Sequence, residues 1–189
     1  YIQEAVSEGR GVLAVSSHLG NWELGGALLA QMGYTVNVVV LPMKDKRTNA
    51  LFQSRRERRG FKIIPIDRTV RGIFDALRRK EFVALLGDRD YSPRNTLHTF
   101  FGLPARLPIG PAKLCVTTGA PILAGTLVRQ PDDSFVMRVH PLIRSQPGSS
   151  VEEVQDKLCR VLEEEIGRHP TQWFLFDEFW KNNGNGSTH

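Results

Sequence analysis

Apolar and polar positions follow two different periods in the first half of the chain. Short runs rich in Val, Ile and Leu carry little charge, which is typical of strands buried on both faces of a sheet. Longer segments repeat apolar residues every three or four positions, which indicates helices with one buried face. The predicted strands are residues 12–15, 35–41, 62–66 and 82–87. The predicted helices between them are residues 22–32, 49–59 and 70–80.

The second half begins with a different kind of segment. Residues 91–111 contain four prolines, so we expect a long loop there, with a short strand near 97–101. The pattern then predicts a helix, two strands, a long amphipathic helix and a short aromatic helix or turn, at residues 111–118, 122–128, 135–139, 151–168 and 173–180. This alternation predicts an α/β fold: one domain with a mixed, largely parallel sheet flanked by helices.

The length of 189 residues suits a single domain, which we place at residues 1–181. The polar, glycine-rich residues 182–189 are expected to form a disordered tail. The chain begins at Tyr1 without a methionine, so we expect it to be an N-terminally truncated fragment of a longer protein. No apolar run approaches the ~20 residues that span a bilayer, so no membrane anchor is expected within it.

The charge of the chain is unevenly distributed. The net charge is +5, but the stretch from Lys44 to Lys80 holds 13 Lys and Arg residues against 4 Asp and Glu residues. A one-sided basic field predicts an anionic partner, such as phospholipid headgroups, an acidic carrier protein or nucleic acid. Cys115 and Cys159 lie alone in apolar contexts without metal-ligand spacing, so we interpret both as reduced core residues.

Candidate chemistry begins where the first predicted strand ends. His18 and Glu23 flank a strand–loop–helix corner, and Asn21 between them is a good helix N-cap. On one helix the two side chains would point about 140° apart, whereas across a corner they can meet. The carboxyl edge of a parallel sheet is where sites form in open α/β folds. The residues therefore place an imidazole and a carboxylate together at this edge, while a buried His18 bonded to the backbone and a helix-capping Glu23 would fit the same pattern.

The corner sequence HLGNWE resembles the His-x4-Asp/Glu box of the glycerolipid acyltransferase superfamily, and most closely its lipid A (lauroyl/myristoyl) acyltransferase branch. Other parts of residues 11–180 resemble this family in the same order. They are Arg56-x-x-x-Gly60, Asp88-Arg89-Asp90, Phe100-Phe101-Gly102-x-Pro104-Ala105, Gly119-Ala120-Pro121 and His169-Pro170-x-Gln172-Trp173.

The resemblance implies roles for these residues. His18 would be the general base and Glu23 the acid that holds and charges it. Arg56, with Arg55 as the second choice, would bind phosphate or carry charge near the reacting centre. The remaining substrate-binding positions implied by the family blocks are Asp88, Asp90, Phe101, Gly102 and Pro121.

The resemblance also implies the reaction and its surroundings. The donor would be an acyl thioester of acyl carrier protein or coenzyme A. The acceptor would be a hydroxyl of a lipid A precursor or a related anionic glycolipid or phospholipid, with no metal or cofactor and no nucleic acid involved. This places the protein in lipid A and lipopolysaccharide biosynthesis, on the membrane surface at the cytoplasmic face of the bacterial inner membrane. On the residues themselves, the apolar side chains of the 91–111 segment are the expected wall of the acyl pocket, next to Gly102 and Ala105; they are Phe100, Phe101, Leu103 and Ile109.

Three alternatives stay open on the sequence. The same chemistry could use another acceptor, such as a phosphatidylinositol mannoside or a lysophospholipid. Asp88 and Asp90 could instead hold Mg²⁺ in a metal-dependent glycosyltransferase. The basic stretch could also belong to a non-catalytic module that binds membranes.

Overall fold

The computed structural model describes residues 1–40, 45–65, 69–90, 96–176 and 179–180. The strands are β1 Val12–Ser16, β2 Val36–Val40, β3 Phe61–Pro65, β4 Phe82–Leu86, β5 Thr96–Phe100, β6 Leu103–Leu107, β7 Ile122–Arg129 and β8 Phe135–Val139. The α-helices are α1 Ile2–Ser7, α2 Trp22–Gln31, α3 Lys46–Arg58, α4 Thr69–Arg78, α5 Gly110–Thr118 and α6 Val151–Arg168, and Pro170–Gln172 form a short 3₁₀ helix.

Six strands form one sheet in the order β3-β2-β4-β1-β7-β8. All neighbours in it are parallel except β8, which returns antiparallel to β7. The prediction of a single α/β domain with a largely parallel sheet is confirmed. The central position of β1 is the feature that matters for function, because its carboxyl end lies between those of β4 and β7.

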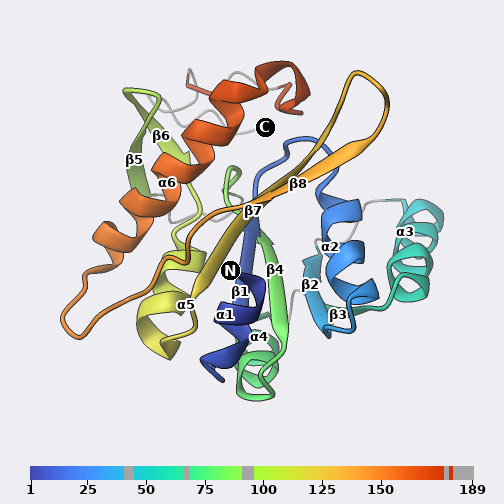
Figure 1. Ribbon diagram of the computed structural model, residues 1–189, viewed down its shortest axis with the longest axis horizontal. Helices are drawn as coiled ribbons and strands as arrows, with labels where there is room; N and C mark the ends of the chain where they lie inside the picture. Colours follow the sequence, from blue (N-terminus) through green and yellow to red (C-terminus); the bar gives the residue numbers. More distant parts are fainter. Residues whose placement is uncertain (41–44, 66–68, 91–95, 177–178, 181–189) are drawn as a thin grey trace.

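Helices cover both faces of this sheet (Figure 1). Leu13 and Val15 of β1 pack with α4, α5, α6 and the β5–β6 hairpin on one face. Val12 and Ala14 alternate to the other face, where they pack with α1 and α2. The basic helix α3 buries none of its residues and lies against β3 at the sheet edge (Figure 1).

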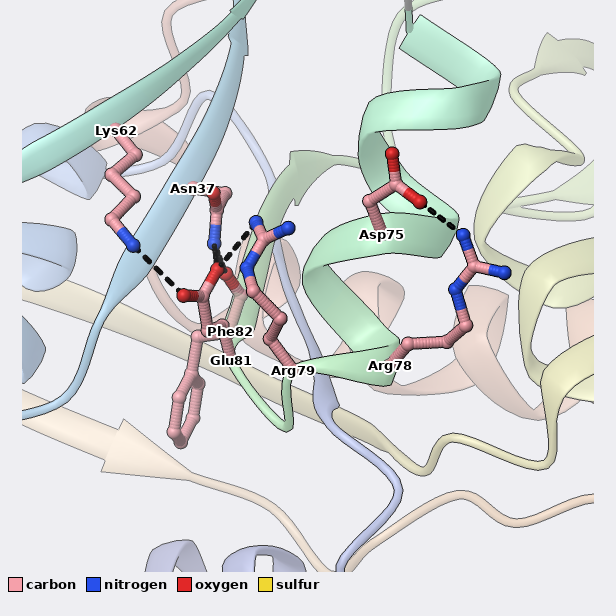
Figure 2. Close-up of polar contacts among 7 residues, drawn as sticks. All are labelled: Asn37, Lys62, Asp75, Arg78, Arg79, Glu81 and Phe82. Atoms are coloured by element: carbon pink, nitrogen blue, oxygen red, sulfur yellow. Dashed lines mark hydrogen bonds and ion pairs between the residues drawn. The ribbon is translucent and has the colours of Figure 1, made fainter.

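The amino edge of the sheet is closed by a charge network around Glu81, the residue before β4. Figure 2 shows Asn37, Lys62 and Arg79 converging on its carboxylate, at 3.0, 2.8 and 2.9 Å. Burial alone would raise the pKa of Glu81, but these three donors outweigh it and lower the pKa to about 2. The network joins β2, β3 and β4 at the end opposite to the candidate site.

Two local features of the structure differ from what the sequence predicts. The helix α1 precedes the first predicted strand, and its six residues are too few to show a clear period. The expected loop with one short strand contains a complete β5–β6 hairpin over residues 96–107, which turns at Phe101 and Gly102, both with positive φ. The start of that loop, residues 91–95, and the expected tail 182–189 lie outside the described residues.

Candidate active site

His18 lies two residues beyond the end of β1, at the carboxyl edge of the sheet. Its Nδ1 atom is 2.8 Å from Oδ1 of Asp88, and its backbone N–H donates to Oδ2 of the same carboxylate, also at 2.8 Å. The Asp88 side chain is fully buried, whereas 16% of the His18 side chain is exposed. A buried carboxylate surrounded by N–H donors is an acceptor, so Nδ1 of His18 carries the hydrogen and Nε2 is left with its lone pair.

The register of two strands explains why these residues meet. Ser16 of β1 and Leu86 of β4 are paired in the parallel ladder. His18 and Asp88 each follow two residues later, so the two chains leave the sheet side by side. The N–H of Gly87 also donates to the Ser16 carbonyl at 2.8 Å, which extends the ladder by one step.

A segment just after α6 supports the same loop from the other side. The indole N–H of Trp173 donates to Oδ2 of Asp88 at 2.9 Å. The backbone N–H of Phe174 donates to the His18 carbonyl at 2.8 Å, and the N–H of Gly20 donates to the Gln172 carbonyl at 3.0 Å. Asp88 therefore accepts hydrogen bonds from two segments: the loop after β1, through His18, and the segment after α6, through Trp173.

Glu23 lies in the first turn of α2, where Asn21 caps the helix by accepting from the N–H of Leu24. The described hydrogen bonds of the Glu23 carboxylate go to Arg56 in the last turn of α3, with Nε 3.0 Å from Oε1. The two ends of the HLGNWE box therefore have separate partners: the His18 ring contacts Asp88, and Glu23 contacts Arg56. Sequence reasoning placed Asp88 in the site but did not pair it with His18.

An apolar cavity of about 750 Å³ opens beside His18. It extends from the carboxyl edge of the sheet between α2 and the sheet face that carries Ala14, Val38 and Ala84. Gly25 and Gly26 open this space, because a Cβ at Gly26 would lie 3.1 Å from the Phe61 ring. Charged residues of the lining come from the carboxyl-edge region, namely Glu23, Arg56, Arg89 and Asp90.

A second, more open hollow of about 800 Å³ lies next to the His18 loop. Its lining combines the backbone turn at Gly20 and Asn21 with Arg129 and two phenyl rings, Phe135 and Phe174. The ring of Phe174 lies edge-on to Trp22, with centroids 6.1 Å apart, and Trp22 lines the apolar cavity. The two hollows therefore adjoin at this aromatic pair.

The other predicted site residues lie in several places. Asp90 lines the cavity with Arg56, while Arg55 is exposed on α3. Phe101 and Gly102 form the hairpin turn against α6, where the N–H of Phe101 donates to Glu163. Pro121 precedes β7 at the amino edge, where its carbonyl accepts from Leu13. The structure thus brings together His18, Glu23, Arg56, Asp88 and Asp90, and not Arg55, Phe101, Gly102 and Pro121.

A buried carboxylate outside this site joins α6 to β7. Glu165 accepts from the Thr126 hydroxyl at 2.6 Å and lies 3.0 Å from Nε2 of His140. Burial raises its pKa, but these two groups outweigh burial, so the pKa of Glu165 stays below its usual value. His140, Glu164 and Glu165 are also the group of described residues with metal-ligand spacing. Arg168 already pairs with both carboxylates, which disfavours a cation there.

The sequence model of the bacterial lipid A biosynthesis acyltransferases matches residues 1–182 of this chain. The chain belongs to this family. Its curated relatives in the family include phosphatidylinositol mannoside acyltransferases from two Mycobacterium tuberculosis strains, CDC 1551 and H37Rv, each 29% identical over 184 residues. The protein of the same name from Mycolicibacterium smegmatis is 27% identical.

The match covers 95% of this acyltransferase-family chain but 58% to 60% of the lengths of those relatives. In the described ranges, none of the helices combines the length and apolar character needed to cross a bilayer. The family resemblance inferred from the HLGNWE box and the blocks that follow it is confirmed.

Proposed function

We propose that the protein transfers a fatty acyl group from a thioester to a hydroxyl group of a glycolipid. The observation that supports this most directly is His18, which is bound to a buried carboxylate and lines an apolar cavity. An imidazole with a free Nε2 is suited to accept a proton near neutral pH. The apolar cavity beside it is suited to a fatty chain.

The reaction would proceed as follows. Nε2 of His18 removes the proton from the acceptor hydroxyl while that oxygen attacks the thioester carbonyl carbon. Asp88 accepts the hydrogen bond from Nδ1 and stabilises the imidazolium that forms, as the acid does in a Ser-His-Asp triad. The C–S bond then breaks, and the proton passes from His18 to the departing thiolate. General base catalysis of this kind contributes ~10²–10⁴-fold.

The acyl chain would lie in the cavity between α2 and the sheet. Its volume of about 750 Å³ falls within the usual range for small-molecule sites, and its lining is mainly aliphatic. In this proposal the 91–111 segment borders the acyl pocket at Pro108, whereas its positions Gly102 and Ala105 lie elsewhere. Ala105 is fully buried with α6 on the opposite face, and a Cβ at Gly102 would meet nothing within 4 Å.

The proposal also extends to the chemical classes of the acyl donor and the acceptor. The exposed basic helix α3 brings Arg56 of its last turn to the cavity, which suits the phosphates of coenzyme A, an acidic acyl carrier protein or an anionic membrane surface. The family name points to lipid A precursors and the relatives to phosphatidylinositol mannosides. Either acceptor would work at the cytoplasmic face of a bacterial membrane. The second hollow, with its phenyl rings and Arg129, would hold part of the glycolipid headgroup.

The test is to incubate the full-length protein with palmitoyl-CoA or palmitoyl-acyl carrier protein and each class of acceptor, then identify products by mass spectrometry. We expect an acylated glycolipid, and a loss of at least ~10²-fold in kcat for His18→Ala. Normal turnover by a folded His18→Ala protein would refute the mechanism.

The glycosyltransferase alternative is less favoured by the contacts of Asp88. Both oxygens of this carboxylate face N–H donors from His18 and Trp173, which occupy the positions that a metal ion would need. Glycosyl transfer that is abolished by a chelator would support that alternative instead.

A further inference from the structure

Asp88 is a charged group with very little access to water. Its side chain is fully buried, so its negative charge depends on hydrogen bonds for stability. Two of the three donors described for this carboxylate come from His18 itself, and the third is the indole N–H of Trp173 at 2.9 Å. Trp173 therefore supplies the one described hydrogen bond to Asp88 that originates outside the catalytic loop.

That indole is held firmly by its neighbours. Its ring packs with the rings of Phe100, Phe101, Phe179 and Trp180, at centroid distances of 5.6 to 6.4 Å. Its backbone forms an antiparallel bridge with Leu19, the residue after His18. The direction of the N–H is therefore fixed relative to both members of the His18–Asp88 pair.

We infer that Trp173 is a positioning residue for the proposed acyl transfer and acts on His18 through Asp88. Its N–H satisfies Oδ2, so that Oδ1 remains directed at Nδ1 of His18. A hydrogen bond to a buried carboxylate also stabilises its ionised form, which is the form that accepts from Nδ1–H. The inference rests on the proposed function for its kinetic consequence, but the coupling itself can be measured without turnover.

The chain offers a closely matched control. Trp180 belongs to the same ring cluster, and its indole N–H donates to the Phe100 carbonyl at 3.3 Å. Trp173→Phe and Trp180→Phe each remove one indole N–H and keep an aromatic ring in the same cluster. The first deprives Asp88 of a donor, and the second does not.

The kinetic test measures kcat and KM for both variants in the full-length protein with palmitoyl-CoA and the acceptor that the wild type uses. We expect Trp173→Phe to lower kcat about tenfold with KM nearly unchanged, because one charge-assisted hydrogen bond is lost outside the substrate contacts. Trp180→Phe should keep kcat within about twofold. Equal losses in both variants would reduce Trp173 to a packing role and overturn the inference.

The spectroscopic test uses protein labelled with ¹⁵N at histidine and tryptophan, with the His18 ring N–H signal identified by its loss in His18→Ala. We expect Trp173→Phe to shift this signal and to speed its exchange with solvent, whereas Trp180→Phe leaves it in place. If Trp173→Phe does not fold, Asp88→Asn should shift the Trp173 indole N–H and not that of Trp180. An unchanged His18 signal in Trp173→Phe overturns the inference. If the signal shifts but the wild-type protein shows no acyl transfer, the inference about Trp173 stands and only the proposed function is refuted.

Discussion

Arg56 and Glu23 form an ion pair that joins the end of α3 to the start of α2, with Arg56 Nε 3.0 Å from Glu23 Oε1. Both residues line the apolar cavity, and the exposed fractions of their side chains are 19% and 27%. The pair fixes a guanidinium beside the same cavity as His18. Its position suits an anionic group of the donor or acceptor.

Removal of either partner of this ion pair should lower the rate of the proposed reaction, but to different extents. We expect Arg56→Ala to lower kcat/KM by about 10- to 100-fold. Glu23→Ala should lower it by less, because the Arg56 guanidinium remains in the protein but is no longer held in position by the carboxylate. Because the residues act as one unit, the double variant should be no worse than Arg56→Ala. Steady-state kinetics on the three variants measures this coupling, and losses that simply multiply would show that the residues act separately.

Asp88→Asn should be far more damaging than the loss of its charge alone would suggest. The amide introduced at this position can present its NH₂ group to Nδ1 of His18. This favours the tautomer that carries its hydrogen on Nε2, and a protonated Nε2 cannot accept the proton of the acceptor hydroxyl. We expect kcat to fall by ~10²–10⁴-fold with a small change in KM. Asp75→Asn is the control, since Asp75 pairs with Arg78 on α4. Similar kcat values in the two variants would contradict the assignment of Asp88.

Chain-length preference should respond to Gly26 rather than to the hairpin turn. A methyl at Gly26 would lie 3.1 Å from the Phe61 ring and would take up space in the cavity. Each CH₂ is worth ~0.8 kcal/mol, so we expect Gly26→Ala to shift relative kcat/KM toward shorter donors by about fourfold per lost methylene. Gly110→Ala, where a Cβ meets nothing within 4 Å, serves as the control. The measurement is a series of acyl-CoA donors, and an unchanged profile in folded Gly26→Ala would exclude this cavity.

The exposed arginines of α3 should contribute to binding more than to chemistry. We expect Arg55→Gln and Arg58→Gln to raise the KM for an anionic substrate or the Kd for anionic vesicles, and to weaken the dependence on salt. Arg78→Gln on α4 removes another exposed charge from a different part of the fold. If all three variants behave alike, binding depends on net charge and not on α3.

The Glu81 network should make folding sensitive to acid. The pKa of Glu81 is about 2 in the fold against an ordinary 4.5, so its stabilisation is complete above pH 4.5 and is lost as the pH falls toward 2. The full shift corresponds to about 3 kcal/mol, and exposure of Lys62 and Arg79 reduces the expected effect to about 1–2 kcal/mol. Urea unfolding of wild type and Glu81→Gln should differ at pH 7 and converge near pH 2. A constant difference across that range would contradict the low pKa.

The sequence predicts the fold better than it predicts the contacts of the site. Periodicity identifies β1, β4 and α6 because buried strands and amphipathic helices have distinct patterns. It also places His18 and Asp88 at strand ends. It does not predict that β1 and β4 are neighbours, because their paired positions Val12 and Phe82 lie 70 positions apart in the chain and strand order is a property of the whole sheet.

The contact between His18 and Asp88 depends on this strand order, so the sequence alone does not predict it. The spacing of His18 and Glu23 suggests that these two side chains contact each other. In the structure, the Glu23 carboxylate instead pairs with Arg56 of α3. One signal was available in the sequence: a titratable residue follows each of the two apolar runs within three positions, at His18 and at Asp88. Trp173 carries no such signal, because its role depends on how the segment after α6 crosses the carboxyl edge.

His18, Asp88 and Trp173 are spread across most of the chain, and this affects when the protein can become active during its synthesis. The ribosome adds Trp173 long after β1 and β4, so a nascent chain holds the histidine and its carboxylate before the indole that supports them. In the proposed mechanism, full acyl transfer would therefore begin only once the segment after α6 has docked against Asp88. We expect a protease cut between α6 and Trp173 to remove the indole hydrogen bond to Asp88 and, with it, the proposed acyl transfer.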